Sequence, residues 1–143
     1  MLYVDASVLV ACYAPEPWTA LAESLVLNTA EVLVSNLTIA ETKNALIRKF
    51  KHGRLVAVEV DEACAQIDAH VASGYFLHFV IPPSLYLLVP TLTREAPVFL
   101  RTADALHLAM AQHLSADLST FDHDLRKAAQ ARGVRVFPAT TPT

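Results

Sequence analysis

The sequence predicts an α/β fold in which helices cover both faces of a parallel sheet. Short β-like runs alternate with longer helical runs along the 143 residues, and such alternation requires crossover connections between parallel strands. The chain has only three glycines and no internal repeat, so most of it is expected to be regular structure. We therefore expect a single domain over residues 1–143, with enough apolar material for a complete core.

The first thirty-five residues predict a strand, two helices and a second strand. Residues 2–4 and 31–35 are short apolar runs typical of buried strands. Between them, residues 7–13 and 18–27 have the length and pattern of helices. The two strands can therefore lie parallel in one sheet, joined by helical connections.

The middle of the chain predicts two longer helices and a strand. Residues 38–51 have apolar positions at helical spacing with cations between them, and Gly53 follows as a stop signal. Residues 58–71 predict the next helix, and residues 76–81 predict a strand. The first of these helices is expected to have one apolar and one basic face.

The last third returns to the same alternation after one irregular segment. Residues 84–95 have a helical pattern, but Pro90 lacks a backbone N–H, so we expect a kink or break there. The elements that follow are an apolar helix, a short strand, a helix and a final strand, over residues 102–114, 117–120, 125–132 and 134–137.

Composition predicts an additional apolar surface. The mean hydropathy is +0.38 with only 17% charged residues, so we expect an apolar face beyond the core, most simply for a homodimer or another partner. No run approaches the roughly 18 to 20 apolar residues of a membrane helix, and no basic segment precedes an apolar one at the N-terminus. We therefore expect a cytoplasmic protein with no membrane contact.

The cations are unevenly distributed although the net charge is −3. Five of the eleven fall within twelve residues: Lys43, Arg48, Lys49, Lys51 and Arg54. A solvated helix face is the simplest interpretation of this cluster, and a surface that binds a polyanion is the alternative.

Four acidic residues stand in apolar or small-residue settings: Asp5, Glu41, Asp104 and Asp122. Burying an isolated carboxylate costs several kcal/mol, so each of them needs partners. Helix capping explains each acid singly. Asp5 and Asp122 are placed as N-caps, and Asp104 lies in a first helical turn. Glu41 completes a capping-box pattern with Thr38.

Together the four acids predict a metal site. All lie at or near the start of a helix, and three follow strands whose carboxyl ends share one edge of the sheet. Like charges gathered there need a compensating cation, and Mg²⁺ or Mn²⁺ is the natural one because hard divalent ions prefer oxygen ligands. Such an ion serves phosphoryl chemistry, and the basic helix near Glu41 would bring a polyanion beside it.

The sequence resembles a PIN domain, most closely the VapC-type toxins of prokaryotic toxin–antitoxin pairs. The matching segments are VDASVLV, LTIAETKNAL, LRTADALHLAMA, and STFDHDLRKAA followed by GVRVF, and LRTADALHLA is the most specific. The resemblance implies a three-layer α/β/α fold and Mg²⁺- or Mn²⁺-dependent endoribonuclease activity. It also implies a homodimer and neutralisation by a small cognate antitoxin.

Carried over residue by residue, the resemblance assigns catalytic and metal-binding roles to the same four acids. Ser7 and Thr120 match hydroxyl positions that accompany the first and last acids, and local capping is the alternative for both. Asp124 competes with Asp122 for the fourth position, but the spacing from Thr120 favours Asp122.

The neighbours of these acids have further possible roles. His107 follows Asp104 by one helical turn, and we interpret it as a packed or hydrogen-bonded residue rather than a ligand. Arg101 can pair with the acids or contact RNA, and the sequence leaves both open. The predicted RNA contacts are Lys43, Arg48 and Lys49.

The predicted function is therefore that of a metal-dependent endoribonuclease, the toxin of a type II toxin–antitoxin pair, with RNA and an antitoxin as partners. An aspartyl phosphatase would need a second Asp two residues after the first, where this chain has Ser7. A receiver domain would need an acidic pair before Asp5. A catalytically inactive PIN-like module for RNA binding or protein interaction is the main alternative, and the presence of all four acids favours catalysis.

Overall fold

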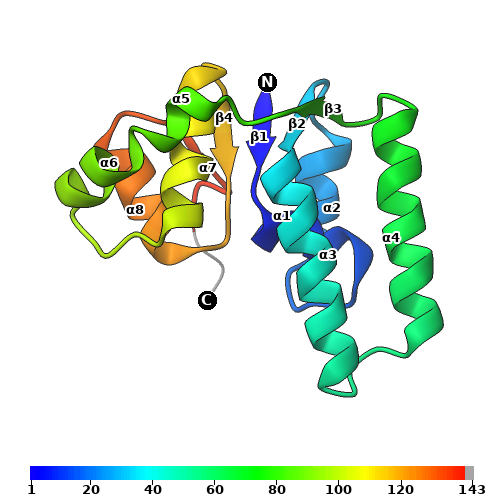
Figure 1. Ribbon diagram of the computed structural model, residues 1–143. Coiled ribbons are helices and arrows are strands. Elements are labelled where there is room, and N and C mark those ends of the chain that lie inside the picture. The colour runs from blue at the N-terminus through cyan, green and yellow to red at the C-terminus, as the bar shows by residue number, and fades with distance from the viewer. Residues whose placement is uncertain (141–143) are drawn as a thin grey trace.

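The structure is a computed structural model that describes residues 1–140 (Figure 1). Within these residues, five strands form one parallel sheet in the order β3-β2-β1-β4-β5. The predicted α/β class with a parallel sheet is confirmed. The elements in chain order are β1 (Leu2–Val4), α1 (Ala6–Tyr13), α2 (Thr19–Leu27), β2 (Val32–Ser35), α3 (Asn36–Lys51), α4 (Ala57–Ala72), β3 (Leu77–Phe79), α5 (Pro83–Tyr86), α6 (Val89–Glu95), α7 (Thr102–His113), β4 (Asp117–Ser119), α8 (His123–Ala131) and β5 (Val136–Phe137).

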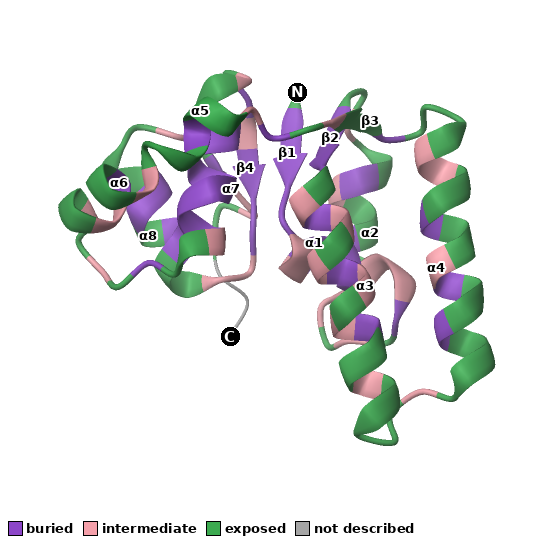
Figure 2. Ribbon diagram, in the orientation of Figure 1, coloured by how far each residue is buried: buried purple, intermediate pink, exposed green. Residues whose placement is uncertain are grey.

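Helices cover both faces of the sheet and give the three layers that the resemblance implies (Figure 1). Helices α5 to α8 pack on one face, around Tyr3, Leu33 and Leu118. Helices α1 and α2 pack on the other face, against Val4 and Val34. Successive strand residues thus alternate between two cores, as a parallel sheet buried on both sides requires. Figure 2 shows that β1 and most of β4 and α7 are buried.

Helices α3 and α4 form a pair beside the sheet and contribute a smaller core with α1. Leu46 of α3 packs there with Val60 and Ile67 of α4, while the outer faces of both helices stay exposed (Figure 2). The predicted stop after α3 is confirmed. Gly53 has a φ of 70°, a conformation that glycine adopts without the steric cost other residues incur.

The strand order places a topological switch point between β1 and β4. From β1 the chain builds outward through β2 to β3, and it then returns to the other side of β1 with β4 and β5. Ligands of open parallel α/β sheets bind beyond the carboxyl ends of the strands at such a point. Asp5 follows β1 directly, and Asp122 lies in the connection between β4 and α8.

The start of α3 differs from its prediction. Ser35 is the N-cap: its hydroxyl accepts a hydrogen bond from the Thr38 N–H at 3.2 Å, and the Thr38 hydroxyl accepts one from the Ser35 N–H at 3.3 Å. The predicted capping box between Thr38 and Glu41 is therefore wrong. Glu41 lies in the second turn of α3, so helix capping does not explain its position.

Residues 84–95 form two short helices instead of one. The interruption falls at Leu87 and Leu88, and Pro90 lies in the first turn of α6. A proline there sacrifices no helical hydrogen bond, because the first N–H groups of a helix have no intrahelical acceptor. The predicted break exists, but it precedes the proline.

Large apolar side chains remain exposed in several segments, as the composition predicts. They include Tyr86, Leu87, Leu88 and Phe99 before α7, Tyr75, Leu77 and Val80 around β3, and Ile47, Phe50, Val56 and Val58 around the connection from α3 to α4. In residues 1–140, every helix is too short or too polar to cross a bilayer. The exposed groups leave apolar surface for contacts with other molecules.

Candidate active site

All four predicted acids line one pocket of about 210 Å³ at the carboxyl edge of the sheet. Their convergence, expected from the sequence, is confirmed. The pocket lining comprises Asp5, Ala6, Ser7, Val10, Glu41, Ala45, Arg48, Arg101, Asp104, His107 and Asp122.

Asp5 is the most buried of the four acids, with 4% of its surface exposed. It caps α1, because its Oδ1 accepts from the Val8 N–H at 3.2 Å. Oδ1 also accepts from the Ser7 hydroxyl at 2.6 Å, and Oδ2 accepts from the Thr120 hydroxyl at 2.6 Å. Burial raises the pKa of Asp5, while the nearby His107 and these hydrogen bonds oppose the rise.

Ser7 and Thr120 tie Asp5 to the loop that follows β4. The Ser7 Oγ accepts from the Phe121 N–H at 2.9 Å, and the Thr120 Oγ1 accepts from the Asp122 N–H at 2.9 Å. Each hydroxyl therefore donates to the Asp5 carboxylate and accepts from the backbone. This pattern fixes the orientation of the Asp5 carboxylate, so both hydroxyls accompany the first acid.

Arg101 joins Asp104 to Asp122. Its Nε donates to Asp104 Oδ2 at 2.9 Å, and its Nη2 donates to Asp104 Oδ1 at 3.2 Å and, more weakly, to Asp122 Oδ2 at 3.4 Å. Hydrogen bonding to Asp104 raises the pKa of Arg101, so the guanidinium stays charged. Of the two roles left open by the sequence, the structure shows pairing with the acids.

Glu41 reaches the pocket from α3 and meets His107 of α7. The Glu41 Oε2 lies 2.6 Å from His107 Nε2, which is the donor because an ionised carboxylate only accepts. The other ring nitrogen, Nδ1, lies 2.8 Å from the Tyr3 hydroxyl, which also contacts Ser35 Oγ at 2.8 Å. Burial raises the pKa of Tyr3, so the phenol keeps its proton. The predicted hydrogen-bonded role of His107 is confirmed.

Tyr3 is the supporting residue that sequence reasoning missed. Tyr3 of β1 is fully buried, and its hydroxyl contacts Ser35 of β2, Thr38 of α3 and His107 of α7, although the strand around it is apolar. A buried tyrosine hydroxyl usually finds a hydrogen-bond partner, so a tyrosine two residues before Asp5 was the available signal. The identity of the partner depended on contacts between residues distant in sequence.

The basic residues of α3 do not form one uniform cationic face. Lys43 Nζ pairs with Asp68 Oδ1 at 2.6 Å, and Lys49 pairs with Glu16. Arg48 lines the acid pocket and has no ion-pair partner within residues 1–140. Of the three predicted RNA contacts, Arg48 is therefore the one that the fold brings to the acids.

Asp122, rather than Asp124, belongs to the pocket. Asp122 caps α8, since its Oδ1 accepts from the Leu125 N–H at 2.8 Å, and its other oxygen faces Arg101. Asp124 is exposed in the first turn of α8 and is not part of the pocket lining. The spacing from Thr120 thus led to the residue that lies beside the other acids.

The donor chemistry of the pocket fits a hard divalent ion, because four carboxylates line it and Asp5 is buried. Within residues 1–140, no three His, Cys, Asp or Glu side chains are already arranged to hold one ion. Arg101 engages Asp104 and Asp122, and His107 engages Glu41. Metal binding therefore requires carboxylate oxygens to exchange these partners for the ion.

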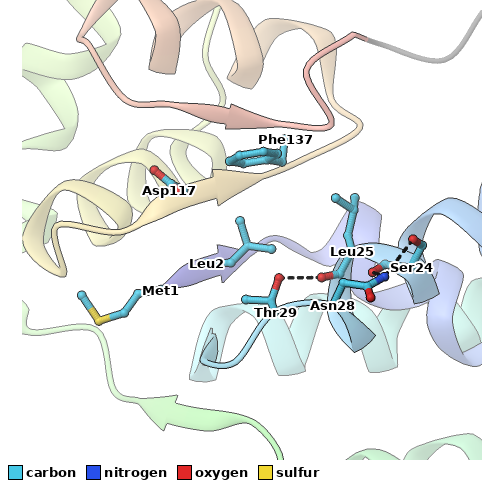
Figure 3. Close-up of a pocket in the computed structure, with 8 residues that line it drawn as sticks. All are labelled: Met1, Leu2, Ser24, Leu25, Asn28, Thr29, Asp117 and Phe137. Carbon is cyan, nitrogen blue, oxygen red and sulfur yellow. Dashed lines mark hydrogen bonds between the residues drawn. The ribbon is translucent and has the colours of Figure 1, made fainter.

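A second cavity, of about 320 Å³, lies at the opposite edge of the sheet, where β1 and β4 begin (Figure 3). Leu2, Leu25 and Phe137 contribute apolar surface to its lining. The Asp117 carboxylate at its rim accepts from Arg135 Nε at 3.0 Å. This cavity lacks the convergent acids, so the pocket at the carboxyl edge is the candidate active site.

Comparison with known proteins agrees with this architecture. A family model described as PIN domain matches residues 2–131. The fold is similar to that of VapC20 from Mycobacterium tuberculosis, with a TM-score of 0.74 and 20% identity over 99% of this chain and 100% of that chain. FitAcB from Neisseria gonorrhoeae gives a TM-score of 0.66 and 21% identity over 97% and 98%. VapBC2 from Rickettsia felis gives a TM-score of 0.64 and 13% identity over 95% and 97%. A search of curated protein sequences finds no significant match.

Proposed function

Because the chain belongs to the PIN domain family, we propose that it is a metal-dependent endoribonuclease and the toxin of a prokaryotic type II toxin–antitoxin pair. The observation that carries this proposal is the meeting of four acids in one pocket at the switch point of the sheet. Capping accounts for Asp5 and Asp122, but Glu41 caps no helix and instead contacts His107 across the pocket. A catalytic site explains all four acids together.

Mg²⁺ or Mn²⁺ would be held by the carboxylates of Asp5, Glu41, Asp104 and Asp122. When bound, such an ion supplies a water of lowered pKa and neutralises charge on the phosphate. Ser7 and Thr120 hold the Asp5 carboxylate in one orientation, and His107 holds Glu41. These supporting hydrogen bonds keep the acids in place before the substrate arrives.

RNA is the proposed substrate, and the pocket cations support this choice. Arg48 and Arg101 line the acid pocket, and a guanidinium group can bind phosphate with two parallel hydrogen bonds. Lys43 would add an outer contact after releasing its ion pair with the exposed Asp68. Lys49 would do so after releasing Glu16 and turning outward, because its side chain is only 13% exposed. VapC20 is a sarcin-ricin loop cleaving toxin, and for this chain we propose RNA as a class. A cytoplasmic location follows from that proposal.

A cognate antitoxin and a second copy of the chain are the proposed protein partners. Two structural neighbours were solved as assemblies, VapBC2 with a DNA fragment from its promoter and FitAB with another DNA fragment. By analogy with these assemblies, we propose that this chain also functions in a complex. The exposed apolar side chains before α7, such as Leu87 and Phe99, offer surface for such contacts. Both partners are proposals that a measurement of oligomeric state and a co-expression experiment can test.

The decisive experiment incubates the purified protein with a mixed RNA pool, with and without Mg²⁺ or Mn²⁺, beside an Asp5→Asn variant. We expect cleavage only by the wild type with metal, and its loss on chelation. RNA binding without cleavage under every condition would identify an inactive RNA-binding module instead. Absence of both binding and cleavage would contradict both functions.

A further inference from the structure

One atom of Arg101 contacts an oxygen of Asp104 and an oxygen of Asp122, and within residues 1–140 neither oxygen has another hydrogen-bond partner. Nη2 lies 3.2 Å from Asp104 Oδ1 and 3.4 Å from Asp122 Oδ2. The other oxygen of each acid also accepts from a backbone N–H. Asp104 Oδ2 accepts from the Arg101 backbone N–H at 3.2 Å and from Arg101 Nε at 2.9 Å, and Asp122 Oδ1 accepts from the Leu125 N–H at 2.8 Å.

From this geometry we propose that Arg101 is a built-in counter-ion that occupies the place of the metal, and that metal binding releases it to bind the phosphate of the substrate. The inference rests on the proposed function and assigns a role to a residue outside the four acids. Nη2 carries positive charge between carboxylate oxygens of Asp104 and Asp122, two of the acids that would hold the divalent ion, and so supplies part of the compensating charge that the ion would bring.

Release of the guanidinium is compatible with the rest of the site. The Arg101 side chain is 68% exposed, so it can turn toward solvent without leaving a cavity. Its two hydrogen bonds to Asp104, whose side chain is 9% exposed, must break first, and an incoming divalent ion would replace the positive charge that they supply. The two carboxylates keep their orientation after it leaves, because backbone N–H groups hold the opposite oxygens. The exchange therefore frees one fixed oxygen on each acid.

The released guanidinium stays at the mouth of the same pocket. Arg101 precedes the first residue of α7, so its backbone remains anchored while its side chain moves. Arg48 lines the pocket as well, and together the two guanidinium groups can hold a phosphate that approaches the acids. Arg101 would thus compete with the metal and assist the substrate.

The test measures Mn²⁺ affinity by calorimetry and RNA cleavage for the wild type, Arg101→Gln and Arg101→Lys. Arg132→Gln is the control, because Arg132 also pairs with an acidic residue, Glu95 at 2.8 Å, but lies outside the pocket lining. We expect Arg101→Gln to bind Mn²⁺ about three- to tenfold more tightly and to cleave RNA at least tenfold more slowly. Arg101→Lys keeps the positive charge but loses the paired N–H donors of the guanidinium. Its Mn²⁺ affinity should therefore lie between those of the wild type and Arg101→Gln.

Unchanged or weaker Mn²⁺ binding by Arg101→Gln would overturn the counter-ion role. Tighter binding with undiminished cleavage would overturn the phosphate role. If the wild type binds Mn²⁺ and cleaves RNA but Arg101→Gln binds Mn²⁺ equally well, the proposed function stands and only the role of Arg101 is contradicted. If neither protein binds Mn²⁺, both fail. Thermal melting of each variant confirms that it is folded before binding is measured.

Discussion

His107 Nε2 lies 2.6 Å from Glu41 Oε2, while the other nitrogen of the same ring lies 2.8 Å from the Tyr3 hydroxyl. One buried imidazole therefore connects α3, α7 and β1. Glu41 extends from the middle of a helix, where the backbone N–H groups are already used by the helix itself. Within the described residues, His107 is the group that orients its carboxylate.

This relationship predicts different effects for two substitutions of His107. Glutamine places an amide nitrogen near the position of Nε2, whereas asparagine places one near Nδ1. His107→Gln should keep the contact with Glu41, and His107→Asn should lose it and reduce RNA cleavage about tenfold to a hundredfold. Both should lower the free energy of unfolding by about 1–3 kcal/mol, because each leaves a buried polar group without its partner.

Cleavage rates and urea unfolding curves of the two variants separate the roles of the ring. Equal losses of activity in His107→Gln and His107→Asn, in proportion to their stability, would mean that His107 only packs the core. A Tyr3→Phe variant serves as the control. It removes the hydroxyl that contacts His107 Nδ1 and leaves the contact between His107 Nε2 and Glu41 in place.

Asp122 and Asp124 offer a matched pair of substitutions two residues apart. Asparagine is as good an N-cap as aspartate, so Asp122→Asn should change the free energy of unfolding by less than about 0.5 kcal/mol. It should nevertheless abolish most cleavage, since Asp122 lines the acid pocket. Asp124→Asn should remain active. An active Asp122→Asn variant together with an inactive Asp124→Asn variant would reverse the assignment.

The basic residues of α3 should contribute unequally to RNA binding. Arg48→Gln removes a cation that lines the pocket, whereas Lys43→Gln removes one that is paired with Asp68. We expect Arg48→Gln to weaken binding to all RNA sequences. The slope of log affinity against log salt concentration should fall by about one, the value for one lost phosphate contact, and both effects should be smaller for Lys43→Gln. Cleavage per bound RNA should fall much less.

Binding curves at several salt concentrations decide whether this face contacts RNA. If Arg48→Gln leaves both the affinity and its salt dependence unchanged, the cations of α3 form only a solvated surface. Lys127→Gln provides a control, because Lys127 is an exposed cation on α8 outside the pocket lining.

Local patterns in the sequence were sufficient to predict the strands, most helices and the meeting of the four acids. Each of these features depends on periodicity or on the rule that parallel strands share one carboxyl edge. The start of α3 was misjudged because two overlapping capping patterns exist there. Ser35 with Thr38 forms the cap, and Thr38 with Glu41 does not. Choosing between them requires knowing that Glu41 has a partner on α7.

The remaining features depend on contacts between distant segments. The pairing of Lys43 with Asp68 requires α3 and α4 to lie side by side, and that arrangement is not encoded in either helix alone. The position of Arg101 between Asp104 and Asp122 likewise requires the loop before α7 to meet the loop after β4. The sequence alone identified Arg101 as a residue near the acids, but it could not decide whether Arg101 pairs with those acids or contacts RNA.

The last prediction concerns the pH dependence of stability that arises from Asp5. Burial raises its native pKa above the ordinary value of 3.8. Between the unfolded and native pKa values, the native state holds more protons than the unfolded state, so the free energy of unfolding falls as pH rises through that interval. The loss persists at neutral pH. In metal-free protein, Asp5→Asn removes this titration and should raise the free energy of unfolding near pH 7.

Metal should reverse this difference between the two proteins. An ion that binds only the native state stabilises it by about 2.7 kcal/mol at a hundredfold excess over Kd. We expect that gain for the wild type with Mn²⁺ and little of it for Asp5→Asn, which has lost a charged ligand. The measurement is the free energy of unfolding from pH 4 to 8, with and without Mn²⁺, with Asp124→Asn as the exposed control. If Asp5 serves only as the N-cap of α1, the variant should instead match or fall below the wild type at every pH, and Mn²⁺ should stabilise neither protein.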